Sequence, residues 1–472
     1  MFNDLREWMQ EVVALGEMRE VRGAHWDQEI GAVADMVNRK PGSPAVLFDE
    51  IVDHPQGYRI LINSVASSKR LSLTLGMPTN LAGRDLAWGW QKLYNEVKPV
   101  SPRPVKEGPV TENIFSGDDI DLTKFPSPCW HSLDGGRYIG TGCMVITRDP
   151  EENWINAGTY RIMLLDKKHV CLYISPGKHG AIQLAKYLNA GKPCPVVITF
   201  GQDPLLFLIS SIEIPYGVSE LDYVGGIRKK PEPVITGEIT GLPIPANAEI
   251  AIEGWVHPGD RAKEGPFGEW TGYYASSSRD EPVVTVERLY HRNDPIILGC
   301  PPGKPPVENT FFRSHMRSVL LEEEIRTAGV PDVKGVWCHE FGGCRFLNVV
   351  AIKQRYSGHA RQAATVAASC RGGAYMGRYV IVVDDDIDIT DINDVMWAVC
   401  TRTDPATSID ILHRFWSGPL DPIIPKDKKG FSTRAIIDAC IPYDWKDQFP
   451  AVVKAPDELM RAVKEKWGSI LD

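Results

Sequence analysis

The middle of the chain reads Asn156-Ala157-Gly158-Thr159-Tyr160-Arg161-Ile162-Met163-Leu164-Leu165, a polar turn that runs into a short apolar segment. A second segment rich in apolar residues, Val170–Ser175, follows shortly after it. Short segments of this kind, separated by turns, are typical of β-strands in a barrel or a sandwich. We therefore predict that the chain is built around a central β domain.

The same pattern continues from Cys143 to about Cys300, with Gly and Pro between the segments. The further strands that it predicts are Cys143–Thr147, Pro195–Phe200, Ala248–Val256, Pro282–Tyr290 and Pro295–Leu298. One helix, Ala181–Asn189, is expected to interrupt them.

The flanking regions mix helices and strands, which indicates an α/β domain on each side. On the N-terminal side we expect a helix after Asp4, strands at Ala45–Phe48 and Tyr58–Val65, and a helix at Asp85–Val97. A proline-rich linker follows, with Pro99, Pro102, Pro104 and Pro109. On the C-terminal side helices and strands alternate: helix Met316–Thr327, strand Phe346–Ile352, helix Gly358–Ser369, strand Tyr379–Val383, helix Asp391–Cys400, and a last amphipathic helix from Asp457 through Leu471. The predicted domains are residues 1–110, 111–310 and 311–472.

Composition is that of a soluble globular protein, with 43% hydrophobic and 24% charged residues. The formal net charge of −9 provides no broad basic surface, so nucleic acids and anionic membranes are poor partners. The N-terminus lacks the apolar core of a signal peptide, and no later segment is apolar enough to span a bilayer. The ten cysteines are scattered without a CxxC pair, which is typical of reduced thiols. We expect a cytoplasmic protein.

Two carboxylates flank a turn in Glu264-Gly265-Pro266-Phe267-Gly268-Glu269. Such a turn can hold the two side chains close enough to titrate as a coupled pair, one of which keeps a proton near neutral pH. The pair can serve as a general acid if a cation such as Arg161 keeps the other carboxylate ionised. From spacing alone, a solvated turn and a surface salt bridge are the more common outcomes.

Several other segments could bind ions. Ser175-Pro176-Gly177-Lys178-His179-Gly180 leads into a predicted helix, where free N–H groups and a lysine suit an anion such as phosphate. Ser219-Glu220-Leu221-Asp222 could offer a carboxylate to Mg²⁺ or Mn²⁺. Asp384-Asp385-Asp386 could do the same, although a solvated strand–loop junction explains it better.

The cluster Cys338-His339 with Cys344 has irregular spacing for a metal site, so core packing explains it better. The sequence contains no Walker A, GxSxG or HExxH motif, and no GxGxxG after a strand. The common nucleotide-binding and hydrolase classes therefore lose their usual support.

Taken in order, these loops resemble the UbiD family of prenylated-flavin-dependent decarboxylases. The similarity runs from about residue 5 to residue 445, and each short match gains specificity from the compatible separations of the others. The matching stretches are Asn156–Arg161, Lys178–Gly180, Ser219-Glu220, Glu264–Glu269 with Gly272-Tyr273, and Val380–Asp386. The resemblance implies a multi-domain α/β fold: an N-terminal α/β unit, a central split β-barrel of the flavin-reductase type that binds the cofactor, and a C-terminal α/β domain with a terminal oligomerisation helix.

The resemblance also implies the reaction, a reversible non-oxidative decarboxylation of an aromatic, heteroaromatic or α,β-unsaturated carboxylic acid. Loss of CO₂ from an sp² carbon needs an organic electron sink, which prenylated FMN provides in this family. Glu269 matches the family's proton donor, and Arg161 and Glu264 match its partners in a catalytic Arg–Glu–Glu network.

By the same resemblance, Asn156, His179 and Glu220 are expected to bind a divalent ion, Mn²⁺ or Mg²⁺, that bridges the protein to the cofactor phosphate. A monovalent cation, K⁺ or Na⁺, is expected nearby. Besides these three residues and Arg161, the positions of the family's cofactor contacts are Thr159, Tyr160, Tyr173, Ile174, Ser175 and Lys178. A basic phosphate contact near Arg371-Gly372 matches only loosely.

Segments that match the lining of the family's substrate pocket do not identify the acid. They are Cys300-Pro301-Pro302-Gly303-Lys304, Glu308 and Gly418-Pro419-Leu420. The expected partners are a small carboxylic acid and CO₂, a flavin prenyltransferase as cofactor supplier, and further copies of the chain in a homodimer or a homohexamer. Two alternatives stay open: a non-catalytic subunit, and an FMN-dependent reductase, since the central domain is barrel-like.

Overall fold

The chain begins with helix α1 (Leu5–Ala14) in the computed structural model, which describes residues 1–40 and 42–470. The Asp4 side chain accepts a hydrogen bond from the Glu7 backbone N–H and so caps the helix. Leu5, Trp8 and Val12 form its buried face, as their spacing predicts.

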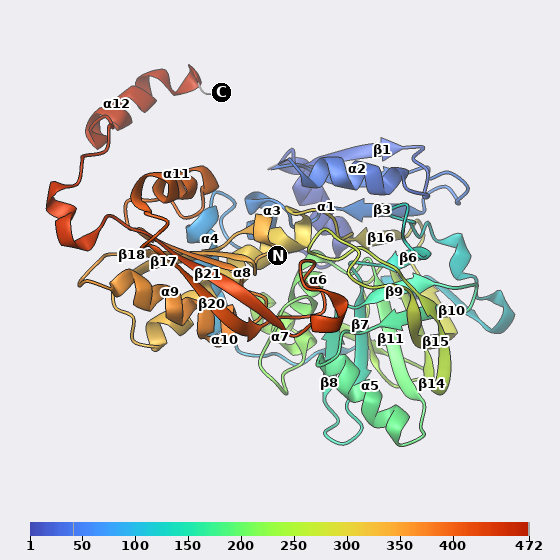
Figure 1. The fold of residues 1–472 in the computed structure, drawn as a ribbon. Helices are drawn as coiled ribbons and strands as arrows, with labels where there is room; N and C mark the ends of the chain where they lie inside the picture. Colours follow the sequence, from blue (N-terminus) through green and yellow to red (C-terminus); the bar gives the residue numbers. More distant parts are fainter. Residues whose placement is uncertain (41, 471–472) are drawn as a thin grey trace.

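A four-stranded sheet with helices packed on it forms the N-terminal region (Figure 1). Its elements are β1 (Met18–Arg22), α2 (Glu29–Asn38), β2 (Ala45–Asp49), β3 (Arg59–Ile62), α3 (Ser68–Thr74) and α4 (Gly83–Glu96). Strand β16 (Ile296–Gly299), from the far end of the central region, pairs parallel to β3 and completes the order β1-β2-β3-β16. This strand ties the N-terminal and central regions together.

The predicted linker is extended, and its backbone is paired. Strand β4 (Arg103–Pro104) lies at the edge of a small sheet beside β12 (Pro233–Thr236), which also pairs with β13 (Pro243–Pro245). An edge position tolerates Pro104, which has no N–H to donate.

The central region is a curled sheet with two free ends, the split barrel that was predicted (Figure 1). Its strands are β5 (Asn113–Ser116), β6 (Arg137–Gly140), β7 (Met144–Arg148), β8 (Ile155–Gly158), β9 (Arg161–Leu164), β10 (His169–Tyr173), β11 (Cys194–Phe200), β14 (Ile250–Glu264) and β15 (Arg279–His291). The order is β6-β9-β10-β15-β14-β11-β7-β8, with β5 paired to β15, and all neighbours are antiparallel. The long hairpin of β14 and β15 forms the middle of this sheet.

The central region contains more helices than the one that the sequence predicts. The predicted helix is α5 (His179–Asn189), and the additional ones are α6 (Pro204–Ser210) and α7 (Glu220–Arg228). Every residue of α6 is buried, so its sequence has no polar face and shows no helical period. In α7, Gly225 lowers the helix propensity but lets the linker approach, because a Cβ there would lie 2.3 Å from the Val100 carbonyl oxygen.

The C-terminal region is a five-stranded mixed sheet in which α9 and α11 cover opposite faces (Figure 1). Its elements are α8 (Glu308–Thr327), β17 (Val333–Cys338), β18 (Leu347–Ile352), α9 (His359–Ser369), α10 (Arg371–Ala374), β19 (Tyr379–Asp384), α11 (Ile392–Arg402), β20 (Ile409–Trp416) and β21 (Phe431–Ala439). The strand order is β17-β18-β19-β21-β20. The edge hairpin of β20 and β21 escapes prediction because most of its side chains are partly or fully exposed.

The chain ends in α12 (Asp457–Trp467), which projects away from the other regions (Figure 1). The helix begins where the sequence predicts, whereas its predicted end at Leu471 lies outside the described residues. Along the part of the chain that the structure describes, no helix is long and apolar enough to cross a membrane. The domain limits at residues 110 and 310 stay predictions.

Candidate active site

Arg161, Glu264 and Glu269 form one ion-pair network in the central sheet. Arg161 Nε lies 2.8 Å from Glu264 Oε1, and Arg161 Nη2 donates to Glu264 Oε2 at 2.9 Å. Arg161 Nη1 donates to Glu269 Oε1 at 3.4 Å, which is a longer and weaker contact. Arg161 therefore holds Glu264 firmly and Glu269 loosely.

Strand geometry brings these side chains together. Arg161 begins β9 and pairs with Tyr173 of β10, while Glu264 is the last residue of β14 and Glu269 lies in the loop before β15. The backbone turns directly after Glu264 because Gly265 adopts a φ of 80°, which favours glycine. Gly135 then packs against this turn, where a Cβ would lie 2.0 Å from the Gly265 carbonyl oxygen.

The two carboxyl groups have different surroundings. The Glu264 side chain is fully buried and also accepts a hydrogen bond from the Tyr138 hydroxyl at 3.0 Å. Burial raises the pKa of Glu269, and the Arg161 guanidinium offsets part of this rise. The pKa of Arg161 itself is above its ordinary value because the pair with Glu264 outweighs the effect of burial. Glu269 is therefore the member of the network that is best suited to carry a proton.

The Asn156 amide, the Glu220 carboxylate and the backbone beside His179 gather around Tyr160, while the His179 ring packs against the rings of Trp154 and Tyr216. The Tyr160 hydroxyl accepts hydrogen bonds from Asn156 Nδ2 at 3.4 Å and from the backbone N–H of Gly180, beside His179, at 3.2 Å. Glu220 Oε2 accepts from the backbone N–H of Ala157 at 2.7 Å. The ends of β8, α5 and α7 thus meet at this point.

The donor set of this cluster fits a divalent cation. Burial raises the pKa of Glu220 to about 7, and its recorded hydrogen-bond partner in residues 1–40 and 42–470 is a backbone N–H, not a cationic side chain. A buried carboxylate in such surroundings is stabilised by a metal ion. Burial and the nearby Lys178 lower the pKa of His179, so its imidazole is neutral and able to ligate. Mixed oxygen and nitrogen donors suit Mn²⁺.

The other predicted cofactor contacts continue from this cluster to the ion-pair network. Thr159 is fixed to the end of α6, where its N–H donates to the Ser210 carbonyl at 2.9 Å. The Tyr173 ring lies 4.4 Å from the Arg161 guanidinium carbon, and Ser175 Oγ donates to the Tyr173 hydroxyl at 3.4 Å. Ile174, between them in sequence, is 9% exposed.

A cluster of cations surrounds Glu213, in the segment between α6 and α7. Lys178 Nζ lies 3.6 Å from Glu213 Oε1, and Arg371 Nη2 lies 4.0 Å from Glu213 Oε2. The Lys178 side chain is 53% exposed. The protein atoms around its ammonium group nevertheless lower its pKa. Burial, together with the nearby Arg317, lowers the pKa of Arg345 to about 10. This excess of positive charge suits a phosphate group. Arg371, which matched the family only loosely, lies next to the same glutamate as Lys178.

The predicted pocket segments lie in different surroundings. Lys304 is exposed, and its backbone packs against the turn at Gly272. Glu308 is buried and accepts hydrogen bonds from Ser64 Oγ and the Val65 N–H, both at 2.7 Å. Gly418 packs against the ring of Tyr375.

The two weaker metal candidates have other roles in the structure. Asp384 and Asp386 both pair with Arg402, at 3.3 Å and 2.7 Å. His339 is fully buried, and burial lowers its pKa to about 4. Among the described residues, no three His, Cys, Asp or Glu side chains are grouped as they would be around a metal ion.

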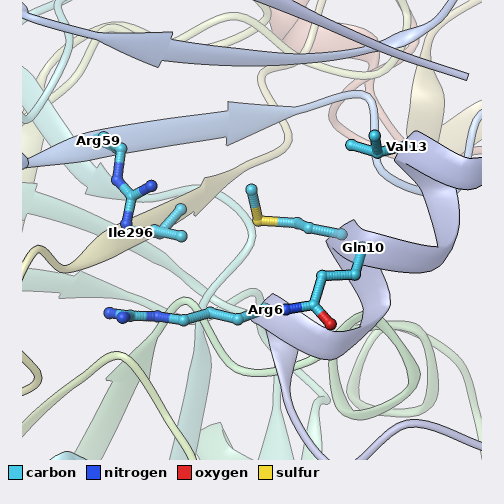
Figure 2. A pocket seen from close by; sticks show the side chains of 6 residues that line it. Arg6, Gln10, Val13, Arg59 and Ile296 are labelled. Atoms are coloured by element: carbon cyan, nitrogen blue, oxygen red, sulfur yellow. The ribbon is translucent and has the colours of Figure 1, made fainter.

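A hollow of about 420 Å³ is lined by none of these residues, and Figure 2 shows the side chains around it. It is a shallow groove between α1, β3 and β16, lined by Arg6, Met9, Gln10, Val13, Arg59 and Ile296. Its two arginines are engaged by the protein: Arg6 pairs with Glu249 at 2.7 Å, and Arg59 Nη2 donates to the Asp294 carbonyl at 2.8 Å. Both guanidinium groups of the groove therefore already have partners within the protein, and the groove contains no carboxylate among its lining residues.

Sequence patterns alone did not reveal Tyr138, Glu213, Arg279 or Arg345. Tyr138 and Arg345 belong to elements far from the matching loops and reach them only through folding. Arg279 could have been found, because pairing β14 with β15 across the loop places it opposite Glu264.

Most of the chain matches the models of one family. Residues 9–90, 103–305 and 310–439 match the N-terminal, Rift-related and C-terminal domains of 3-octaprenyl-4-hydroxybenzoate carboxy-lyase, UbiD. A pyrrole-2-carboxylic acid decarboxylase of Pseudomonas aeruginosa is 31% identical, over 98% of this chain and 97% of that protein.

Solved structures give the same result. Vanillic acid decarboxylase of Sedimentibacter hydroxybenzoicus in its open form is 29% identical with a TM-score of 0.87, over 100% of this chain and 99% of that one. HmfF, a UbiD-class enzyme of Pelotomaculum thermopropionicum in complex with FMN, is 29% identical with a TM-score of 0.85, over 96% and 97%. An evolved dimeric form of HmfF in complex with prFMN has a TM-score of 0.81 at 27% identity, over 98% of both chains.

The hydrogen bond from Tyr138 to Glu264 yields a first prediction. Tyr138→Phe keeps the ring, whose centroid lies 4.0 Å from that of Phe267, but removes a donor to a buried carboxylate. We expect the free energy of unfolding to fall by about 1–2 kcal/mol, measured by urea denaturation.

Tyr290→Phe is the matched control, since the Tyr290 hydroxyl donates to another buried carboxylate, Glu253, at 2.9 Å. Both variants should lose stability, and only Tyr138→Phe should also change the titration of the network. An unchanged stability of Tyr138→Phe would contradict the role of this bond.

Proposed function

The chain belongs to the UbiD family of carboxy-lyases and is a decarboxylase of that family, and we propose that it carries out the reversible non-oxidative decarboxylation of an aromatic, heteroaromatic or α,β-unsaturated carboxylic acid with prenylated FMN. The observation that carries the proposal is the network of Arg161 with Glu264 and Glu269. It provides a buried carboxyl group with a raised pKa beside a fixed cation, which is what a general acid requires.

The proposed cofactor site extends from Tyr173 to Glu220. Relatives of the same fold were solved with FMN and with prFMN, which supports a flavin here. Asn156, His179 and Glu220 would hold Mn²⁺ or Mg²⁺, with a monovalent cation nearby, and Lys178 with Arg371 would face the phosphate. When bound, prenylated FMN supplies the electron sink that decarboxylation at an sp² carbon needs.

Residues of the chain itself bind and donate the proton. Arg161 pairs with Glu264 through two short contacts and with Glu269 through one longer contact, so Glu269 is the carboxyl that carries a proton to the carbon that loses CO₂. Glu269 lies in the loop between β14 and β15 and contacts Arg161, which packs on the Tyr173 ring, and we propose that the substrate lies on this side of the sheet. We place the protein in the cytoplasm, with a flavin prenyltransferase as its cofactor supplier.

Glu269→Gln tests the proton donor. The substitution keeps the shape of the side chain but removes the exchangeable proton, so turnover should fall by about 100-fold or more while the flavin stays bound. The measurement is CO₂ release from a panel of aryl acids, with protein co-produced with a flavin prenyltransferase. Glu287→Gln, an exposed position on β15, is the control. Near-normal turnover of Glu269→Gln refutes the assignment, and NAD(P)H oxidation by the wild type would identify a reductase instead.

Glu220→Ala tests the proposed metal site. Loss of a ligand should lower both the manganese content and the flavin content after dialysis, measured by plasma mass spectrometry and by absorbance. Asp222→Ala removes a carboxylate of the same helix that is outside the proposed ligand set, and it should retain both. If Glu220→Ala keeps its flavin and its metal, Glu220 is not a ligand.

We also propose that α12 joins copies of the chain into a homodimer or a homohexamer. Its apolar side chains recur at helical spacing and are all exposed: Leu459, Met460, Val463 and Trp467. An apolar face of this kind is stable in water when a partner covers it. A chain that ends at Pro450 should form assemblies with fewer copies than the full chain, as given by the light-scattering mass divided by the mass of one chain. An unchanged number of copies would assign assembly to another surface.

A further inference from the structure

Arg279 lies at the mouth of the loop that carries Glu269. In the ladder of β14 and β15, the last pair before this loop is Glu264 with Arg279, and Ala262 pairs with Glu281 two residues earlier. Side chains two residues apart lie on the same face of a strand, so Glu264, Arg279 and Glu281 share one face. Cys171 of β10 pairs with Val283 on this face, which places Tyr173 and, beside it on β9, Arg161 there as well.

The contacts of Arg279 connect it to this network on two sides. Its Nε lies 2.7 Å from Glu281 Oε1, and its guanidinium carbon lies 4.0 Å from the centre of the Tyr173 ring. The same ring lies under the Arg161 guanidinium at 4.4 Å. The Tyr173 ring therefore contacts two arginines, and each of these arginines also has a carboxylate partner.

The charges of this face do not balance if every group is ionised. Two arginines, Arg161 and Arg279, face three carboxyl groups, and a buried excess charge is costly. Glu264 and Glu281 each have an arginine nitrogen within 2.8 Å, whereas Glu269 lies 3.4 Å from its nearest arginine nitrogen. A proton on Glu269 removes the excess charge with the least loss of ion pairing.

We propose that Arg279 is a positioning residue of this network: by pairing with Glu281 and packing on Tyr173 it limits how tightly Glu269 holds its proton, so that Glu269 can release it. The inference rests on the proposed role of Glu269. It goes beyond that role because it concerns Arg279, which pairs with Glu281, whereas Glu269 pairs with Arg161. Burial raises the pKa of Glu269, and the charged groups that act on it are Arg161 and Arg279, which lower it, and Glu264, which raises it.

The sign of the effect follows from these charges. Arg279→Gln removes a cation near Glu269 and leaves Glu281 uncompensated, and both changes favour the protonated form of Glu269. Its titration should therefore move to higher pH. Glu281→Gln leaves Arg279 without its carboxylate, so more positive charge acts on Glu269 and its titration should move to lower pH. A variant with both substitutions removes one charge of each sign and should titrate near the wild type.

The experiment follows the protonated carboxyl band of Glu269 by infrared difference spectroscopy against pH, with Glu269→Gln to assign the band. The midpoint should rise by about one pH unit in Arg279→Gln, fall in Glu281→Gln and return in the double variant. Arg279→Lys keeps the charge and should stay near the wild type. Lys263→Gln is the matched control, since Lys263 pairs at 3.1 Å with Asp280 of the same hairpin and both side chains are exposed.

The outcomes separate this inference from the proposed function. The alkaline limb of the pH profile of CO₂ release should move with the infrared midpoint. If the infrared midpoints shift as expected but the protein releases no CO₂, the proposed function is rejected and the role of Arg279 is not. An unchanged midpoint in Arg279→Gln, or a double variant that shifts as far as Arg279→Gln, overturns the role of Arg279. Should Arg279→Gln fail to fold, a midpoint that does not fall in Glu281→Gln, which preserves shape, overturns it equally.

Discussion

The pair between Arg161 and Glu264 is the interaction on which the site depends. A fully buried carboxylate is tolerated only with donors on its oxygens, and here a guanidinium and the Tyr138 hydroxyl provide them. Because these groups come from β9, β14 and β6, the pair also joins strands that lie apart in the sheet order. Glu269 is then left with the weaker share of the same arginine, and its environment favours the proton.

The central sheet carries two kinds of site, one suited to proton transfer and one suited to a metal ion and a phosphate. At the end of β14, charged groups are buried among protein atoms, where proton affinities shift strongly. Towards α5 and α7, Glu220 and the cations around Glu213 form surroundings suited to a metal ion and a phosphate. The proposed flavin nucleotide carries a phosphate at one end and a reactive ring at the other, which corresponds in kind to these two surroundings.

Contacts between the N-terminal, central and C-terminal regions fix the positions of these two sites. Strand β16 completes the N-terminal sheet although it follows the central strands, and the linker at β4 pairs with β12. Arg371 reaches Glu213 from the C-terminal region. The position of the C-terminal region relative to the central sheet therefore affects the cations near the proposed phosphate site directly.

The sequence by itself determined the regular elements whose apolar residues repeat with a clear period, such as α1 with its Asp4 cap, and the loops with distinctive residues, such as Glu264–Glu269. It did not reveal α6, which is buried on all sides, or the edge hairpin of β20 and β21, because neither shows the periodicity on which prediction relies. Only the tertiary structure decided that Arg161 holds two carboxyl groups unequally and that Arg279 and Glu281 lie on the same face. Such distances depend on strand register and on buried packing between segments about one hundred residues apart, whereas a sequence motif records only the residues along one segment.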